Sequence, residues 1–129
     1  MEKQKKHESI FVIQEHHATH LHWDFRLEIN GLLKSWAIPK KPPEKKGIKR
    51  LAIQVEDHPL TYANFEGKIP EGQYGAGKVK IWDKGKYILD SIKSDKIVFH
   101  LKGKKLKGKY VLVKTKTGKQ KKNWLFFKV

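Results

Sequence analysis

The stretch that decides the fold is THLHWDFRLEI, residues 19–29, in which apolar and polar side chains alternate without interruption. Strict alternation is typical of a β-strand, because successive side chains of a strand point to opposite faces of its sheet. The apolar series, which we expect to face a core, is Leu21, Trp23, Phe25, Leu27 and Ile29. The polar series is His20, His22, Asp24, Arg26 and Glu28. One strand thus predicts both a buried face and a face that can carry chemistry.

Similar runs lie on both sides of this strand. The pair Asn30–Gly31 is a hairpin turn signal that leads into a strand at 32–38. Other β-rich runs lie at 9–16, 50–57, 77–83, 96–101, 109–115 and 123–129. We expect a flexible tail over 1–8, a loop over 39–47 and a solvated hairpin turn over 114–123. Many short strands without long helical periodicity favour an all-β, single-domain antiparallel β-barrel over residues 1–129.

Composition narrows the class of protein. The chain has 129 residues, of which 38% are hydrophobic, and this argues for a folded globular protein. It has no cysteine, so disulfides and thiolate metal sites are excluded. The N-terminus lacks the apolar run of a signal peptide, and no segment approaches the roughly 18 apolar residues of a membrane span. We therefore expect a soluble, cytoplasmic monomer.

Charge is concentrated in the second part of the chain. The net charge is +16, and residues 84–129 hold 15 lysines against two acidic residues, Asp90 and Asp95. A polyanionic partner explains this excess, because lysines that neutralise phosphates release counterions, and nucleic acid is the favoured polyanion. The alternative is a compositional bias or heat adaptation, since arginine occurs only at positions 26 and 50.

The polar face of residues 19–29 predicts a metal site. His22 and Asp24 are two residues apart on one face, and imidazole with carboxylate suits Mn, Fe, Co or Zn. His16, at the end of the previous strand, can supply a third ligand through the intervening turn. Such a set leaves positions open for water or substrate. His17 and His20 are weaker candidates, and an ordinary solvated strand face is the alternative interpretation.

Basic residues near this set predict phosphate binding. Arg26 offers a planar fork that can hold two phosphate oxygens. Arg50 opens a strand on which alternation predicts one shared polar face, made of Arg50, Ala52, Gln54, Glu56 and His58. Lys40 is a further candidate on a loop, and simple surface charge is the alternative for both Lys40 and Arg50. The glycine-rich stretch 72–78 lacks the ending of a P-loop and predicts a tight turn instead.

Two motifs carry a family resemblance. They are H-x5-H-x-D-x-R at residues 16–26 and V-E-D-H-P-L-x-Y at residues 55–62. With their surroundings, over about residues 9–129, they resemble the 3′-phosphoesterase domain of bacterial ligase D and its stand-alone archaeal relatives. The resemblance implies a β-barrel with a crescent-shaped active-site groove.

The resemblance also implies an activity and a set of site residues. A phosphodiesterase step removes a 3′-terminal ribonucleoside from a primer–template end, and a phosphomonoesterase step then leaves a 3′-hydroxyl. Manganese is the implied cofactor, with Co²⁺ or Zn²⁺ as alternatives. His16, His22 and Asp24 match metal ligands, and Arg26 and His58 match groups that hold the scissile phosphate. Further matching active-site positions are Lys40, Arg50, Glu56 and Tyr62.

The sequence also differs from the family at its N-terminus, and other functions compete with the one that the resemblance implies. Residues 1–8 do not reproduce the functional N-terminal arm of bacterial members, and without fused domains a ligase and a polymerase would be separate partner proteins. His58 is a reasonable general acid, because imidazole titrates near neutrality. One competing class is a non-catalytic, basic nucleic-acid-binding barrel. Another is a hydrolase of small phosphorylated metabolites, which the charge of +16 disfavours.

Overall fold

The computed structural model describes residues 8–115 and 122–129, and within these ranges it forms nine strands and one short 3-10 helix. In chain order these are β1 (Glu8–His17), β2 (Leu21–Ile29), β3 (Leu32–Ile38), β4 (Lys49–Pro59), η1 (Leu60–Asn64), β5 (Gly67–Ile69), β6 (Gly77–Lys93), β7 (Lys96–Lys102), β8 (Lys107–Lys114) and β9 (Asn123–Lys128). Alternation locates most of these strands. It misses η1 and β5, and it ends β6 too early, at residue 83.

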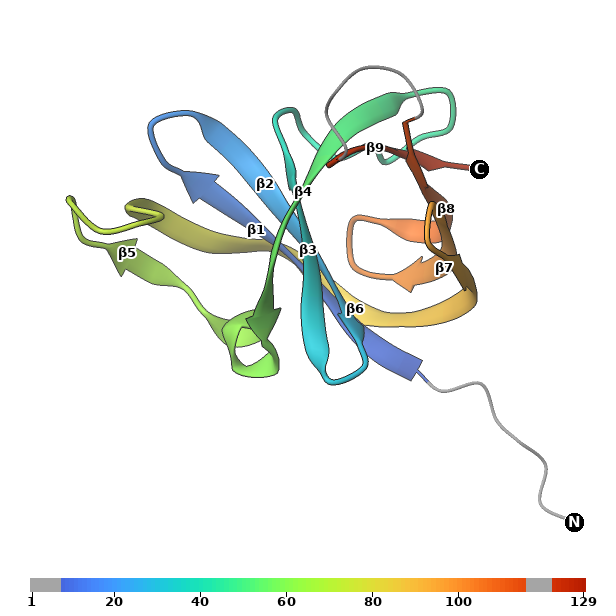
Figure 1. The fold of residues 1–129 in the computed structure, drawn as a ribbon, viewed down its shortest axis with the longest axis horizontal. Helices are drawn as coiled ribbons and strands as arrows, with labels where there is room; N and C mark the ends of the chain where they lie inside the picture. Colours follow the sequence, from blue (N-terminus) through green and yellow to red (C-terminus); the bar gives the residue numbers. More distant parts are fainter. Residues whose placement is uncertain (1–7, 116–121) are drawn as a thin grey trace, which may run out of the picture.

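The strands form one antiparallel sheet that closes on itself (Figure 1). Neighbours follow the order β1-β2-β3-β4-β9-β8-β7-β6, and the pairing of β1 with β6 completes an eight-stranded barrel. The short strand β5 adds to the first residues of β6, which also pair with the end of β1. Closure removes free sheet edges from the barrel itself. The predicted all-β antiparallel barrel is confirmed.

The apolar series of the strands fills the barrel interior. Phe25 contacts rings from two other strands, with centroid distances of 4.7 Å to Phe126 and 5.8 Å to Phe99. Burying a side chain of this size stabilises a fold by about 1.5–3 kcal/mol. Other fully buried members include Phe11, Ile13, Leu27, Trp36, Ile38 and Tyr110. The predicted core face of residues 19–29 is therefore confirmed at its centre.

A second, smaller apolar cluster lies on the outer side of the barrel wall and anchors η1. Val12 of β1 and Leu33 of β3 pack with Ala63 of η1. Val12 neighbours Phe11 and Ile13, which belong to the interior core, so Val12 points outward. This packing holds the segment after β4 against the outside of the barrel, next to the polar face of β2.

Strand β4 does not follow the predicted alternation. The sequence predicts that Arg50, Ala52, Gln54, Glu56 and His58 share one polar face. Instead Ala52 is buried in the interior core, and Gln54 pairs with Trp36, another core residue. The part of the predicted face before residue 55 therefore belongs to the barrel interior, and this prediction is wrong.

A β-bulge explains the error. Leu33 pairs with His58, whereas Ser35 pairs with Val55, so β4 has one extra residue between these two pairs. An extra residue reverses the alternation of the strand beyond it. His58 thus lies on the outer face with Val55 and not on the face of Ala52. Sequence alternation alone contains no signal for this shift.

The predicted turns agree with the structure where it describes them. Asn30 and Gly31 both have positive φ, 53° and 81°, as a tight hairpin turn requires. Residues 39–48 connect β3 and β4 as a loop apart from one isolated bridge at Lys46. The predicted tail at 1–8 lies outside the described residues except for Glu8, which opens β1. Most of the predicted turn at 114–123 also lies outside them, but β8 and β9 pair antiparallel on either side. Among the described residues no helix has the length and apolarity to cross a membrane.

Candidate metal centre and phosphate site

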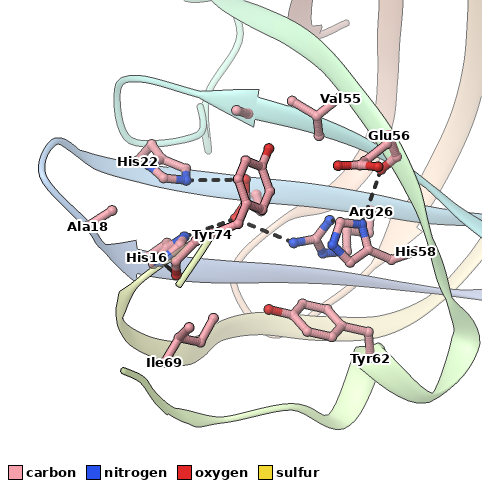
Figure 2. Close-up of a pocket in the computed structure, with 13 residues that line it drawn as sticks. His16, Ala18, His22, Arg26, Val55, Glu56, His58, Tyr62, Ile69 and Tyr74 are labelled. Carbon is pink, nitrogen blue, oxygen red and sulfur yellow. Dashed lines mark hydrogen bonds and ion pairs between the residues drawn. The ribbon is translucent and has the colours of Figure 1, made fainter. Parts of the chain in front are cut away.

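A pocket of about 280 Å³ lies on the outer wall of the barrel, between the strands and the segment that follows β4 (Figure 2). Seven of the nine predicted site residues line it, namely His16, His22, Asp24, Arg26, Glu56, His58 and Tyr62. Lys40 and Arg50 are not among its lining residues. The structure therefore gathers residues from β1, β2, β4 and η1 that are distant in sequence.

The register of the first hairpin places the two histidines together. His16 of β1 pairs directly with His22 of β2, and Asp24 lies two residues further along the same strand. The ring centroids of His16 and His22 are 4.8 Å apart. Nδ1 of His16 lies 3.6 Å from Oδ2 of Asp24, and Nε2 of His22 lies 3.4 Å from Oδ1. The predicted trio thus meets at one point, with its ligand atoms within 4.8 Å of one another.

Backbone carbonyls fix which ring nitrogen of each histidine faces the carboxylate. Nε2 of His16 donates to the carbonyl of Gly75 at 2.8 Å, and Nδ1 of His22 donates to the carbonyl of His20 at 3.0 Å. A neutral imidazole carries one proton, so Nδ1 of His16 and Nε2 of His22 are left as lone-pair nitrogens. Two lone pairs and a carboxylate facing one another need a cation between them. This donor set fits a divalent transition metal.

The neighbours of Asp24 keep its carboxyl group ionised. Burial acts to raise the pKa of its carboxyl, but the polar interactions with the side chains of His16 and His22 and the charge of Arg26 outweigh burial. They hold the pKa of Asp24 well below its usual range, so the group is ionised at any pH near neutrality. The hydrogen bond to Asp24 in turn raises the pKa of His22. Without a metal ion, His22 therefore takes up a proton more readily than a free imidazole does.

Arg26 lies in the wall of the pocket with only 3% of its surface exposed. Its Nε donates to Oε1 of Gln14 at 2.7 Å, and its Nη1 donates to Oγ of Ser35 at 2.8 Å. Its Nη2 lies 3.4 Å from Oδ2 of Asp24. The guanidinium is therefore not the free fork that the sequence predicts. Most of its donors hold protein groups in place, and only part of the Nη edge remains for a phosphate.

His58 is held beside this guanidinium. Its Nδ1 lies 3.1 Å from Nη1 of Arg26 and 3.1 Å from the carbonyl of Glu56. The two contacts need different tautomers, because Nδ1 must be bare to accept from Arg26 and protonated to donate to Glu56. Burial and, after it, the charge of Arg26 lower the pKa of His58. The ring is thus kept neutral near pH 7, with its proton on one nitrogen or the other.

Tyr62 of η1 covers this pair. The Cζ atom of Arg26 lies 4.9 Å from the centre of the Tyr62 ring, and the ring centroids of His58 and Tyr62 are 4.7 Å apart. Phe65 stacks on the same tyrosine at 5.1 Å. The aromatic ring is therefore in contact with protein groups on more than one side. These contacts help to keep Arg26 and His58 in position.

Gln14 is a site residue that the sequence analysis missed. Its side chain is fully buried, and it accepts from Arg26 while its Nε2 donates to the carbonyls of Tyr62 and Phe65 at 2.8 and 3.3 Å. It thereby links the guanidinium to η1. The signal was present, because Gln14 is a polar residue in an apolar run and shares the face of His16 two positions later.

The remaining predicted residues lie at other places. Lys40 is exposed on the loop after β3, and Arg50 at the start of β4 uses its Nε to donate to the carbonyl of Lys41 at 2.8 Å. His17 contacts Glu15, and His20 contributes its backbone carbonyl to His22. Neither His17 nor His20 joins the metal-ligand trio that the described residues form.

Known proteins are similar to this chain over most of its length. Residues 14–114 match the family model described as the DNA ligase D 3′-phosphoesterase domain. The multifunctional non-homologous end joining DNA repair protein LigD of Mycobacterium tuberculosis is 51% identical over 109 residues, which cover 81% of this chain and 14% of that protein. The LigD protein of Pseudomonas aeruginosa is 46% identical over 123 residues, covering 92% and 15% respectively. The chain therefore spans only a small part of the length of these relatives.

Proposed function

The chain belongs to the DNA ligase D 3′-phosphoesterase domain family, and on that premise we propose that it is a metal-dependent hydrolase that heals DNA 3′ ends. The substrate would be a DNA or RNA–DNA primer–template end. One step would release a 3′-terminal ribonucleoside, and a second would remove the remaining 3′-phosphate. The observation that carries this proposal is the convergence of His16, His22 and Asp24 beside the buried Arg26.

The donor set supports a divalent ion as cofactor, and Mn²⁺ is our first candidate, with Co²⁺ and Zn²⁺ as alternatives. His16 would bind through Nδ1, His22 through Nε2 and Asp24 through its carboxylate, because these atoms face one another. When bound, such an ion supplies Lewis-acid chemistry to a phosphate oxygen and to a water. The carbonyls of Gly75 and His20 would fix the orientation of the two rings.

The other pocket residues support cleavage of a phosphate ester. Arg26 brings a permanent positive charge next to Asp24, where charge on a phosphate would develop. As a general acid His58 would be protonated on both nitrogens, with Nδ1 donating to the carbonyl of Glu56 and Nε2 giving its proton to the leaving oxygen, because a neutral imidazole that lost its proton would become an imidazolate. This protonated form is the minor one near pH 7, since the pKa of His58 is lowered. In the first step the bond from phosphorus to the 5′-oxygen of the terminal nucleoside would break. Water would supply the new oxygen on phosphorus and release a proton to the solvent, and the departing 5′-oxygen would take a proton from the doubly protonated His58.

The charge of the chain and the names of its relatives support the choice of substrate. The relatives are named as non-homologous end joining proteins, and we extend DNA end processing to this chain as a proposal. Lysines of residues 84–129 would contact the nucleic-acid backbone without reading its sequence. A ligase and a polymerase would act on the healed end afterwards. Roles for Lys40, Arg50 and Glu56 in either step stay predictions.

A labelled primer–template ending in one 3′ ribonucleotide tests this function. Incubation with the protein and Mn²⁺ should give a shortened strand with a 3′-phosphate, followed by one with a 3′-hydroxyl. The variant His22→Ala should give neither product. The control variant His20→Ala should give both, because it removes an exposed imidazole that is not part of the ligand trio. Binding of the DNA without cleavage under Mn²⁺, Co²⁺ or Zn²⁺ would instead indicate a non-catalytic nucleic-acid-binding barrel.

A further inference from the structure

Tyr74 is exposed in a way that packing does not explain. With 89% of its surface open to solvent, it far exceeds the other exposed large hydrophobic residues among those described, which reach 45% at most. Yet Tyr74 lines the same pocket as the two histidines and the aspartate (Figure 2). It lies in the loop between β5 and β6. An aromatic ring that stabilises no core therefore stands at the mouth of a polar site.

The backbone around Tyr74 is anchored although its ring is free. The next residue, Gly75, accepts the hydrogen bond of His16 at 2.8 Å through its carbonyl. Two turn hydrogen bonds tie the loop to itself, from Gln73 to the carbonyl of Pro70 and from Ala76 to the carbonyl of Gln73. At Gly77 the loop runs so close to β1 that an added Cβ would lie 2.2 Å from a backbone oxygen. The position of Tyr74 is thus coupled to a metal ligand.

Tyr74 is also the pocket aromatic whose ring faces are open. Tyr62, the other tyrosine of the pocket, is covered by Arg26, His58 and Phe65. A planar ligand that enters the pocket therefore finds the ring of Tyr74 open for stacking, whereas the ring of Tyr62 is already in contact with protein groups. Aromatic side chains bind single-stranded nucleic acids by stacking on bases, and this tolerates any base because each has a π-face.

Resting on the function proposed above, we propose that Tyr74 is a stacking platform for the terminal nucleobase of the substrate strand. A phosphodiester beside His16, His22 and Arg26 has a nucleoside on its leaving side, and the ring of Tyr74 lines the same pocket. Tyr74 is then a specificity-determining residue. It makes the protein select 3′ ends whose last sugar carries a base, whatever that base is.

Binding without cleavage tests the proposal. A primer–template with 2-aminopurine on its 3′-terminal ribose is titrated with protein in the presence of a chelator, next to the same strand with an abasic terminal sugar. We expect the base-bearing end to bind about 5- to 150-fold more tightly, which is the range of one stacked base. Tyr74→Ala should abolish this difference and the accompanying fluorescence quenching, whereas Tyr74→Phe should keep both. Leu32→Ala, which removes an exposed apolar side chain of the β2–β3 hairpin, is the matched control.

Two results would overturn the role of Tyr74. One is a Tyr74→Ala variant that still prefers the base-bearing end, and the other is a variant that loses affinity equally for both ends. Cleavage by the wild-type protein with Mn²⁺ is measured separately on the same strands. Absence of cleavage would contradict the proposed hydrolase, while the affinity ratio would still decide whether Tyr74 stacks on a base.

Discussion

Arg26 is a buried cation whose donors are directed to three different elements of the fold. It reaches Gln14 on β1, Ser35 on β3 and His58 on β4, besides Asp24 on its own strand. Hydrogen bonds that involve a charged group contribute about 1.5–3 kcal/mol each, and a buried unpaired partner costs a similar amount. One residue therefore connects the metal ligands to the groups that would act on the phosphate.

We expect Arg26→Lys to lower both stability and activity. A lysine keeps the charge but has a single nitrogen that cannot reach Gln14, Ser35 and Asp24 together. The free energy of unfolding in urea should fall by about 2–3 kcal/mol, and cleavage of the ribonucleotide-ended primer should fall on the order of 100-fold or more. In the unfolding measurement Arg50→Lys is the control, because Arg50 loses only one bond, to Lys41. Near-normal cleavage by Arg26→Lys would show that the phosphate binds elsewhere.

At the scale of elements, the loop between β5 and β6 connects the pocket to the barrel wall. Gly77, where β6 begins, has a φ of 125°, and a Cβ there would lie 2.2 Å from the carbonyl oxygen of His17. Gly72, in the same loop, has a φ of 87° with no atom within 4 Å of an added Cβ. The two glycines share a backbone conformation that L side chains rarely adopt, but only one also has a close neighbour.

This difference gives a matched pair of substitutions. Gly72→Ala should destabilise the fold by about 1 kcal/mol, the cost of a positive φ alone. Gly77→Ala should cost clearly more in urea unfolding and should weaken Mn²⁺ binding, since the loop can escape the clash only by moving away from β1 and from His16. Equal effects of the two substitutions would mean that the loop tolerates displacement without disturbing the metal ligands.

Strand β6 is also joined to β2, on the other side of their shared neighbour β1, through a buried tyrosine. The hydroxyl of Tyr87 donates to the carbonyl of Glu28 at 2.7 Å, and burial, with the charge of Glu28 after it, raises the pKa of Tyr87 to about 12. The unfolded chain ionises near pH 10. Because the folded pKa is the higher one, this stability is complete below about pH 10 and is lost as the pH rises towards 12.

Comparison with Tyr87→Phe isolates this contribution. At pH 9 the phenylalanine variant should be less stable than the wild-type protein by about 1 kcal/mol, the value of one hydrogen bond. Between pH 9 and pH 11 the urea midpoint of the wild-type protein should fall more steeply, because only it has this hydroxyl to ionise. Parallel losses in the two proteins would assign alkaline sensitivity to groups that both share, namely the lysines and the other tyrosines.

At the scale of the whole molecule, the positive charge sets how the protein meets nucleic acid. The net charge is +16, and most of it lies in residues 84–129, whose described strands, from the second part of β6 to β9, form part of the barrel wall. Affinity for a primer–template should fall steeply with salt, on the order of 10³-fold between 50 and 200 mM if six or more phosphates are contacted. Fluorescence anisotropy at several salt concentrations measures this. A flat response would separate the lysines from substrate binding.

Features of the fold and the site that depend on residues close in sequence could be predicted, and features that depend on the pairing of distant strands could not. Alternation is a local property, so it predicts the two faces of β2 and most strand positions correctly. The meeting of His16 with His22 follows from the hairpin between them and was also predictable. The bulge in β4 depends on how β3 and β4 pair, so the sequence alone could not predict which face of the strand His58 occupies. The internal partners of Arg26 depend on three strands and were likewise beyond a single sequence.

The central claim is that His16, His22 and Asp24 hold one divalent cation. Titration with Mn²⁺, followed by the electron paramagnetic resonance signal of the free ion, measures this directly. We expect one ion per chain in the wild-type protein and in His20→Ala. In His22→Ala and Asp24→Ala, with unchanged circular dichroism, we expect affinity to fall by about 100-fold or more. A wild-type protein that binds no ion, or a His22→Ala variant that binds it equally well, would contradict the claim.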